Sequence, residues 1–432
     1  MASTKAVEQK ASTGYSNYVL LVLFLGYVSN SLDRGILNVL LPPIQEEFDL
    51  SYTQLGLLGG IAFALFYSTL GIPIASLADR TSRKWVLAAS MATWSAMTAL
   101  CGFAGNFLQL LGARVGTAIG EAGGSPPSHS LIADYFPISR RGTALSIYAL
   151  GVSVGAVIAG PLGGIGNDLW GWRTAFIVAG APGLFIALLV ALTVKEPPRG
   201  MSDGIAIKAA AKGNPFAAVP DILRRKAFRH MALAAALHAF VWYGAGNFNS
   251  VFLRETHGLS SSTYGSLIAA FAACGAVGTF LGGLASDRLS SRFGDERFYM
   301  WVPGGAAVIG IPFQLLGYLA PTIPLVVVGF ALSAFFASFF FGPSFAMAQG
   351  LASPSRRAIA ASVLLFIQTM IGLGLGPVIT GWIADTFTSL RLAEPLRYAL
   401  VLVALINLWS GFHYWLASRT VRADLAEAKS EV

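Results

Sequence analysis

Apolar runs long enough to cross a membrane recur along the whole chain. An α-helix rises about 1.5 Å per residue, so about 20 apolar residues span the hydrocarbon core of a bilayer. The runs lie at 17–41, 53–78, 84–104, 107–133, 142–165, 173–194, 228–252, 263–286, 298–319, 323–349, 357–384 and 396–417. The fourth, tenth and eleventh contain glycine and proline, and we expect them to bend. With 55% hydrophobic and 12% charged residues, the sequence predicts an all-α membrane protein of about twelve transmembrane helices.

Basic side chains concentrate in every second connection between these runs. They are Arg80, Arg83 and Lys84, then Arg140 and Arg141, then Lys195 to Lys226, then Arg288 to Arg297, then Arg356 and Arg357, and finally Arg419 and Arg422. Lys and Arg accumulate in the cytoplasmic loops of membrane proteins, so we expect a multi-pass protein of the cell inner membrane with both termini in the cytoplasm. This topology explains the net charge of +8, and no nucleic-acid partner is expected.

The chain is predicted to divide into two halves of six runs each. We assign 1–16 to an N-terminal cytoplasmic tail, 17–195 to the first bundle, 196–227 to a cytoplasmic linker, 228–418 to the second bundle and 419–432 to a C-terminal cytoplasmic tail. A related segment follows the second and the eighth runs, from Gly71 to Lys84 and from Gly282 to Arg288. Such a repeat predicts two bundles related by pseudo-two-fold symmetry, with a substrate site between them near the midplane.

Two charged residues, Arg114 and Glu121, lie inside the fourth apolar run. A charge at the bilayer centre costs about 3 kcal/mol on insertion scales, so charges there are expected to be functional. A spacing of seven residues places both on one helix face, about 10 Å apart along the axis. The residues between them are small and allow close approach of another helix or a ligand. The alternative interpretation is a structural ion pair.

The first run contributes a second charged pair, Asp33 and Arg34, to the same predicted cavity. The four charges sum to zero, which lowers the cost of burial. Asp33–Arg114 and Arg34–Glu121 are plausible pairings, which the sequence cannot fix. Arg34 and Arg114 are candidate ligands of an anionic headgroup, whereas Asp33 and Glu121 are candidate proton carriers. For Asp33 and Arg34 the alternative is snorkelling at a helix end.

The loop after the second run resembles the signature motif of the major facilitator superfamily. Asp79, Arg80, Arg83 and Lys84 match it, whereas Ala75 and Ser82 replace its glycines; the second copy matches at Gly283, Asp287 and Arg288. The resemblance implies that Asp79, Arg80, Arg83, Lys84, Asp287 and Arg288 hold a cytoplasmic gate. The alternative is that these charges only set topology.

A narrower resemblance is to the spinster branch of this superfamily. It depends on Leu32-Asp33-Arg34, on Arg114 with Gly120-Glu121-Ala122, and on Asp134. Animal spinsters export sphingosine-1-phosphate or lysophospholipids, so the resemblance implies an amphiphilic lipid-like substrate. The short loops and the many Gly and Ala residues look bacterial.

Gly155, Gly160, Pro161 and Gly164 in the fifth run resemble the antiporter motif of the superfamily. Glycines permit close helix contact and a proline kinks a helix, so this segment is a candidate hinge, and it favours export. The alternative is ordinary glycine-mediated packing.

The second half has few charges in its runs but many aromatic residues. Candidate substrate contacts there are Trp242, Tyr243, Asn247, Phe336 and Phe340. An apolar wall opposite a charged one suits an amphiphile, although core packing or contact with lipid would explain the same residues.

We therefore predict a secondary active transporter that works by alternating access, coupled to protons, and exports an amphiphile with an anionic or zwitterionic head. A proton-linked carrier of small organic anions or sugar acids is the alternative within transport. A membrane hydrolase using Ser128 and His129 is disfavoured, because neighbouring helical side chains diverge and no GxSxG elbow is present. No phosphate-binding loop or metal-ligand motif is found, so no cofactor or metal is expected. The expected partners are the substrate, protons and membrane lipids, and we expect a monomer.

Overall fold

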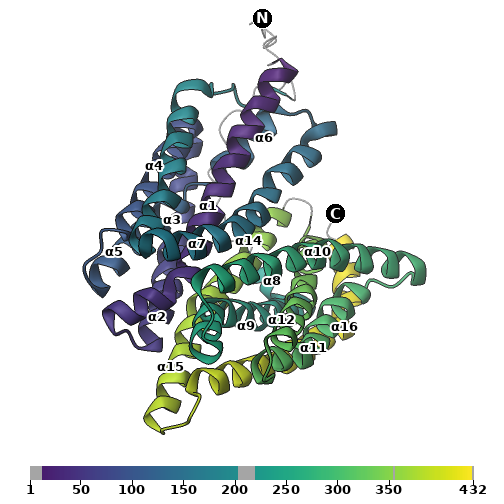
Figure 1. The fold of residues 1–432 in the computed structure, drawn as a ribbon. Coiled ribbons are helices and arrows are strands. Elements are labelled where there is room, and N and C mark those ends of the chain that lie inside the picture. Colours follow the sequence, from purple (N-terminus) through teal and green to yellow (C-terminus); the bar gives the residue numbers. More distant parts are fainter. Residues whose placement is uncertain (1–11, 203–218, 354–355, 431–432) are drawn as a thin grey trace, which may run out of the picture. The chain divides into compact units, whose positions relative to one another are not determined.

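The computed structural model describes residues 12–202, 219–353 and 356–430, and these residues form helices joined by short connections. By its internal packing the chain divides into two compact units (Figure 1). Unit 1 comprises Met1–Leu40 and Leu65–Lys212, and unit 2 comprises Leu41–Ala64 and Gly213–Val432. Two helices, α1 (Thr13–Phe48) and α3 (Ile61–Arg80), each contribute residues to both units.

The helices of unit 1 are held together by a core of aliphatic and aromatic side chains. Besides α1 and α3, it contains α4 (Arg83–Cys101), α5 (Phe107–Glu121), α6 (Ser125–Tyr135) and α7 (Ile138–Thr193). The core includes Leu23 of α1, Met91 and Trp94 of α4, Leu131 of α6 and Val190 of α7. Helix α4 packs against both α5 and α7.

Helix α7 contains both the fifth and the sixth predicted spans. Gly171 lies inside it with φ 79° and ψ 159°, a backbone conformation that ends regular helix and that L side chains rarely adopt. The two predicted spans therefore meet at a glycine turn rather than at a longer loop.

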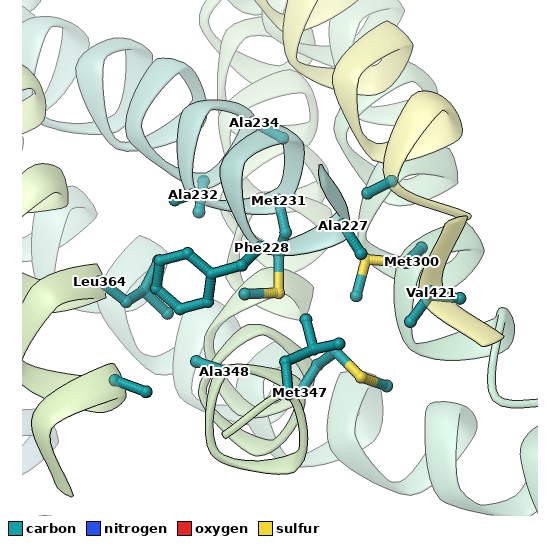
Figure 2. Packing of buried hydrophobic residues seen from close by; sticks show 14 of the residues in the cluster. Ala227, Phe228, Met231, Ala232, Ala234, Met300, Met347, Ala348, Leu364 and Val421 are labelled. Atoms are coloured by element: carbon teal, nitrogen blue, oxygen red, sulfur yellow. The ribbon is translucent and has the colours of Figure 1, made fainter. Parts of the chain in front are cut away.

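Unit 2 contains the remaining helices. They are α2 (Tyr52–Gly59), α8 (Val219–Arg224), α9 (Lys226–His257), α10 (Ser261–Phe293), α11 (Phe298–Leu319), α12 (Ile323–Ala337), η2 (Ser338–Phe340), α13 (Phe341–Gly350), α14 (Arg357–Ile367), η4 (Gln368–Leu375), α15 (Gly376–Ser389) and α16 (Pro395–Ser430). Figure 2 shows Phe228 and Met231 of α9 packed with Met347 of α13 and Leu364 of α14, beside Val421 of α16.

Each of the twelve predicted spans coincides with a helix, part of a helix, or an interrupted helix in the structure. Eight described helical stretches are long and apolar enough to cross a membrane by length and composition. The predicted bends are present: residues 122–124 separate α5 from α6, a 3₁₀ turn (η2) separates α12 from α13, and a π-helical segment (η4) separates α14 from α15.

One interruption was not predicted, in the second span. Helices α2 and α3 are separated at Gly60, which has φ −109° and ψ −114°. A Cβ atom on Gly60 would lie 2.5 Å from the Gly56 carbonyl oxygen and 3.1 Å from that of Gly374, so only glycine fits there. The periodicity of an apolar run does not reveal such an approach of backbone from a distant segment.

The ends and the predicted linker differ in detail from the sequence assignment. The described part of the N-terminal tail joins α1 from Thr13, and α16 continues to Ser430 through most of the C-terminal tail. The short helix expected near 216–227 is α8, and residues 203–218 of the linker lie outside the described residues.

Candidate functional site

A buried ion pair joins the first and fourth spans within unit 1. The guanidinium Nε of Arg34 on α1 donates to a carboxylate oxygen of Glu121 at the end of α5. The Arg34 side chain is 35% exposed, whereas that of Glu121 is fully buried. The Tyr67 ring of α3 lies 4.6 Å from the guanidinium carbon and adds a cation–π contact. Of the two pairings left open by the sequence, the structure contains Arg34–Glu121.

Arg114 lies on α5 about two turns before Glu121. Its side chain contacts the backbone of the first span. Its Nη1 donates to the carbonyl oxygen of Asp33 at 3.3 Å, and both residues are buried. The Thr98 hydroxyl of α4 faces the Asp33 carboxylate. Arg114 therefore binds the main chain of Asp33 and also interacts electrostatically with its carboxylate.

Small residues between Arg114 and Glu121 allow α4 to pack closely on α5, as the sequence predicts. A Cβ atom on Gly120 would lie 2.5 Å from the Trp94 backbone nitrogen, and one on Gly116 would lie 2.6 Å from the Met97 sulfur. Larger residues at these positions would displace α4 and, with it, the wall of the charged cluster.

The glycine-rich part of α7 packs against α1 immediately before the charged residues. A Cβ atom on Gly155 would lie 2.4 Å from the Val28 carbonyl oxygen, and the Ser31 hydroxyl donates to the Val152 carbonyl oxygen at 2.7 Å. Gly160 and Gly164 are buried, and Pro161 lies inside the helix between them. The motif is thus a close helix contact; its role as a hinge stays a prediction.

The first copy of the loop motif forms an ion-pair network in unit 1. Arg83, 1% exposed, binds the Asp134 carboxylate and also donates from Nε to Glu196 at 2.8 Å. The backbone N–H of Lys84 donates to Glu196 at 2.9 Å. Burial alone would raise the pKa of Glu196, but these donors and the Ser82 hydroxyl lower that pKa below its usual range. Glu196 was missed in the sequence, where it looks like an ordinary linker charge.

The other gate candidates lie at the surface. Asp79 forms an ion pair with Arg199 at 3.4 Å, and Arg80 is exposed. In the second copy, in unit 2, the Tyr299 hydroxyl donates to Asp287 at 2.7 Å, and Arg288 is exposed.

The aromatic candidates of unit 2 divide into packed and exposed residues. Phe340 is buried, with its ring 4.7 Å from that of His238 and 6.4 Å from that of Trp242, which is 39% exposed. Phe336 stacks on Phe313 at 5.6 Å. Trp242 is therefore the more accessible of these rings, whereas Phe340 belongs to the packing of the unit.

Two further candidates in α9 are more enclosed. Asn247 is buried and its side-chain amide donates to the Leu55 carbonyl oxygen at 3.4 Å, while Tyr243 is half-buried.

A third residue of α9, His238, places its ring nitrogens 2.8 Å from Asn407 Oδ1 and 2.7 Å from the Ala337 carbonyl oxygen, where α12 ends and the 3₁₀ turn begins. The aromatic content of this run predicted contacts but not this role of His238 in capping a broken helix.

A carboxylate that the sequence did not single out caps a helix in unit 2. Asp385 of α15 accepts from the backbone nitrogens of Tyr52 and Thr53, at 2.9 and 2.8 Å, and from the Thr53 hydroxyl at 2.6 Å. These groups form the N-terminus of α2, where unpaired N–H groups favour a negative charge.

Comparison with known proteins identifies the family. The profile of the Major Facilitator Superfamily matches residues 23–313 and, in a second match, residues 231–431. The chain belongs to the Major Facilitator Superfamily. An MFS-type efflux pump of Mycolicibacterium smegmatis is 32% identical over 408 residues, which cover 94% of this chain and 93% of that one. The hexuronate transporter of Bacillus subtilis is 26% identical over 376 residues, which cover 85% and 87% of the two chains.

Among solved structures, this facilitator is similar to a bacterial homologue of the human lysosomal transporter spinster, in an inward-facing and unoccupied conformation. The two are 35% identical with a TM-score of 0.86, over 96% of this chain and 99% of the other. This similarity confirms the expected membership of the spinster branch and the all-α fold.

Members of this superfamily are membrane transporters, so the facilitator is a multi-pass membrane transporter and not an enzyme. The structure agrees with that conclusion at the residues considered for a hydrolase. The Ser128 hydroxyl donates to the Gly124 carbonyl oxygen of its own helix at 2.8 Å, and the His129 ring packs against Tyr148. Neither is arranged as a nucleophile with its base.

Proposed function

We propose that this facilitator is a proton-coupled exporter of an amphiphile that carries an anionic or zwitterionic headgroup. The observation that carries the proposal is the Arg34–Glu121 ion pair, in which a buried carboxylate binds the guanidinium of a partly exposed arginine. A guanidinium binds phosphate and carboxylate through parallel hydrogen bonds, so the same group of Arg34 suits a substrate anion.

Protonation of Glu121 is the proposed coupling step. A neutral Glu121 would no longer hold Arg34, and the freed guanidinium would bind the substrate headgroup in its place. Release of the proton would restore the ion pair and expel the headgroup, so this step taken alone favours anion–proton symport. A zwitterionic headgroup that competes with protons for the carboxylates would instead give antiport, which is the coupling that export requires. Asp33 and Arg114 complete a cluster whose four charges sum to zero, and we assign Arg114 to headgroup binding and Asp33 to proton coupling.

The apolar part of the substrate is assigned to the aromatic residues of unit 2. Trp242, Tyr243 and Phe336 are exposed or half-buried and supply flat apolar surface, whereas Asn247 and Phe340 are buried. Such a surface suits an acyl chain, which supports a lysophospholipid or sphingosine-1-phosphate type of substrate.

A small sugar acid is the second candidate substrate. The similarity to the hexuronate transporter of Bacillus subtilis favours it, and its carboxylate would bind Arg34 by the same chemistry. Export is supported by the similarity to the MFS-type efflux pump of Mycolicibacterium smegmatis and by the glycine contact between α7 and α1.

The remaining assignments complete the proposal. The facilitator would act as a monomer in the cell inner membrane with both termini cytoplasmic, by alternating access. The network of Arg83, Asp134 and Glu196, with Asp79 nearby on the exposed loop, would close the inner gate, and Asp287 with Arg288 would act in the second copy.

The test is transport in proteoliposomes under an imposed pH gradient, with a lysophospholipid, sphingosine-1-phosphate and hexuronate as substrates. Movement of the lipids and not of hexuronate supports the first candidate, and movement of hexuronate alone supports the second. The sign of the gradient that drives movement separates symport from antiport. Transport that ignores the gradient for every substrate would refute proton coupling.

A further inference from the structure

Two histidines of unit 2, neither of which the proposed function uses, bind each other. Nδ1 of His230 on α9 lies 3.0 Å from Nδ1 of His413 on α16, and the two rings are tilted by 25° with their centres 5.2 Å apart. Both side chains are half-buried. One proton serves this bond in the neutral pair, so one ring carries its own proton on Nε2 and the other has a free lone pair there. The histidine pair therefore retains a donor and an acceptor for a further partner.

The histidine pair adjoins a strip of exposed aromatic rings on α16. The rings of Trp409 and Phe412 lie 6.0 and 5.8 Å from that of His413, and Phe412 stacks on Trp415 at 5.8 Å. All three rings of this aromatic strip are exposed. Because α16 is long and apolar enough to cross a membrane, we expect rings exposed on it to contact acyl chains. The remaining imidazole nitrogens therefore lie beside lipid.

The depth of the histidine pair follows from where the two helices become polar. Helix α9 begins at Lys226, four residues before His230, which is about 6 Å along the axis. In α16 the last apolar residue of the predicted span is Ala417, four residues after His413. These positions place the pair near the boundary between acyl chains and headgroups, where aromatic side chains of membrane proteins also concentrate.

Two arginines without a carboxylate partner flank the histidine pair and the aromatic strip. Arg229 is exposed and interacts electrostatically with the ring of His230. The guanidinium carbon of Arg419, also exposed, lies 5.0 Å from the centre of the Trp415 ring. Neither arginine forms an ion pair with any described residue, whereas Arg422 of the same helix is 2.8 Å from Asp295. This surface is therefore positively charged and supplies no counter-ion of its own.

We propose that Arg229, His230 and His413 bind the phosphate of an anionic phospholipid whose acyl chains lie on the aromatic strip. Guanidinium and imidazole N–H groups donate to phosphate oxygens, and these charge-assisted hydrogen bonds are stronger than neutral ones. Basic side chains at the membrane surface attract anionic lipids, and flat apolar rings suit acyl chains.

Other occupants use only part of this surface. Snorkelling of long side chains to the membrane surface accounts for the arginines, but an imidazole is short and here is held in place by its partner. A zwitterionic phospholipid would place its ammonium group against Arg229 and Arg419. A free phosphate ion would make no use of the aromatic strip. An anionic phospholipid matches both the charge and the apolar rings.

The experiment measures the binding of single lipid molecules to the purified full-length protein in detergent by native mass spectrometry. The probes are phosphatidylglycerol, which is anionic, and phosphatidylcholine, which is zwitterionic, with identical acyl chains. We expect the first phosphatidylglycerol to bind about tenfold more tightly than phosphatidylcholine. Arg229→Gln and His230→Phe should each raise the Kd of phosphatidylglycerol about tenfold, because a hydrogen bond to a charged phosphate is lost, and should leave that of phosphatidylcholine unchanged.

The matched control is Arg292→Gln on α10 of the same unit. Arg292 is exposed and its guanidinium carbon lies 5.7 Å from the centre of the exposed Phe293 ring, but no histidine accompanies it in that helix. This variant should bind both lipids as the wild type does. Monodisperse elution and a Tm near that of the wild type identify the folded variants, and the exposed Arg229 tests the site even where His230→Phe does not fold.

Three outcomes would overturn the lipid site. The first is equal affinity of the wild type for the two lipids, and the second is an unchanged Kd for phosphatidylglycerol in folded Arg229→Gln. The third is displacement of phosphatidylglycerol by inorganic phosphate at a comparable concentration, since the aromatic strip would then contribute nothing to binding.

Discussion

Arg34 of α1 and Glu121 of α5 form an ion pair in which one side chain is partly exposed and the other is fully buried. The exposed partner can meet a ligand while the buried carboxylate cannot. A change in the protonation of Glu121 would therefore alter what Arg34 is free to bind. This asymmetry leads to two predictions on transport.

Glu121→Gln should reduce transport driven by a pH gradient at least about tenfold, since the amide carries no titratable proton and binds Arg34 more weakly than a carboxylate does. Substrate binding should persist because the guanidinium is freed. Proteoliposome flux against the size of the gradient measures the first effect, and equilibrium binding the second. Glu296→Gln, in the connection between α10 and α11, is the control. Gradient-driven flux that survives in Glu121→Gln would exclude Glu121 as the coupling residue.

Arg34→Lys keeps the positive charge but loses the planar pair of donors. We expect the substrate Kd to rise about tenfold, because one charge-assisted hydrogen bond to the headgroup is lost. The protein should remain folded. Competition binding with a lysophospholipid and with hexuronate measures Kd for both candidate substrates. An unchanged Kd for both would mean that Arg34 has a structural role and does not contact the headgroup.

Gly155→Ala should destabilise unit 1, because the new methyl group would lie 2.4 Å from the Val28 carbonyl oxygen. Overpacking of this kind costs about 1–3 kcal/mol. Thermal unfolding in detergent measures the change in Tm. Gly142→Ala, in the same helix with no atom within 4 Å of the added carbon, is the matched control and should be neutral or stabilising. An equal Tm for the two variants would show that α1 and α7 separate easily at this contact.

The spans and their bends were predictable from the sequence because they depend on local properties. Length and hydropathy placed the twelve runs, and glycine with proline indicated where the fourth, tenth and eleventh are interrupted. The pairing of four charges was left open, since the sequence contains two arginines and two carboxylates and only packing decides which arginine reaches Glu121.

Contacts between distant segments carried no signal in the sequence. Asp385 and the N-terminus of α2 are more than 300 residues apart, and neither segment contains a motif that predicts their contact.

Asp385→Ala should destabilise unit 2 by about 0.5–2 kcal/mol, the usual cost of removing a helix N-cap. It removes acceptors from the Tyr52 and Thr53 backbone nitrogens, which are 2.9 and 2.8 Å from the carboxylate. Asp385→Asn retains one oxygen and should lose less. The midpoint of thermal unfolding compares the two with the wild type. If Asp385→Ala has the wild-type midpoint, the Ser51–Gln54 capping box suffices to hold α2.

Asp295, in the connection between α10 and α11, should make stability depend on acidic pH. Hydrogen bonds from Arg297, joined by Arg422 of α16, lower the pKa of Asp295 from 3.8 to about 2. Because the folded pKa lies below the unfolded one, the contribution to stability is present above about pH 4 and is lost as the pH falls toward 2. Asp295→Asn should therefore lower Tm at about pH 7, and the difference from the wild type should shrink below about pH 4. The neighbouring Glu296→Gln should show no such convergence. A Tm difference that stays constant down to about pH 2 would mean that Asp295 acts through its shape and not its charge.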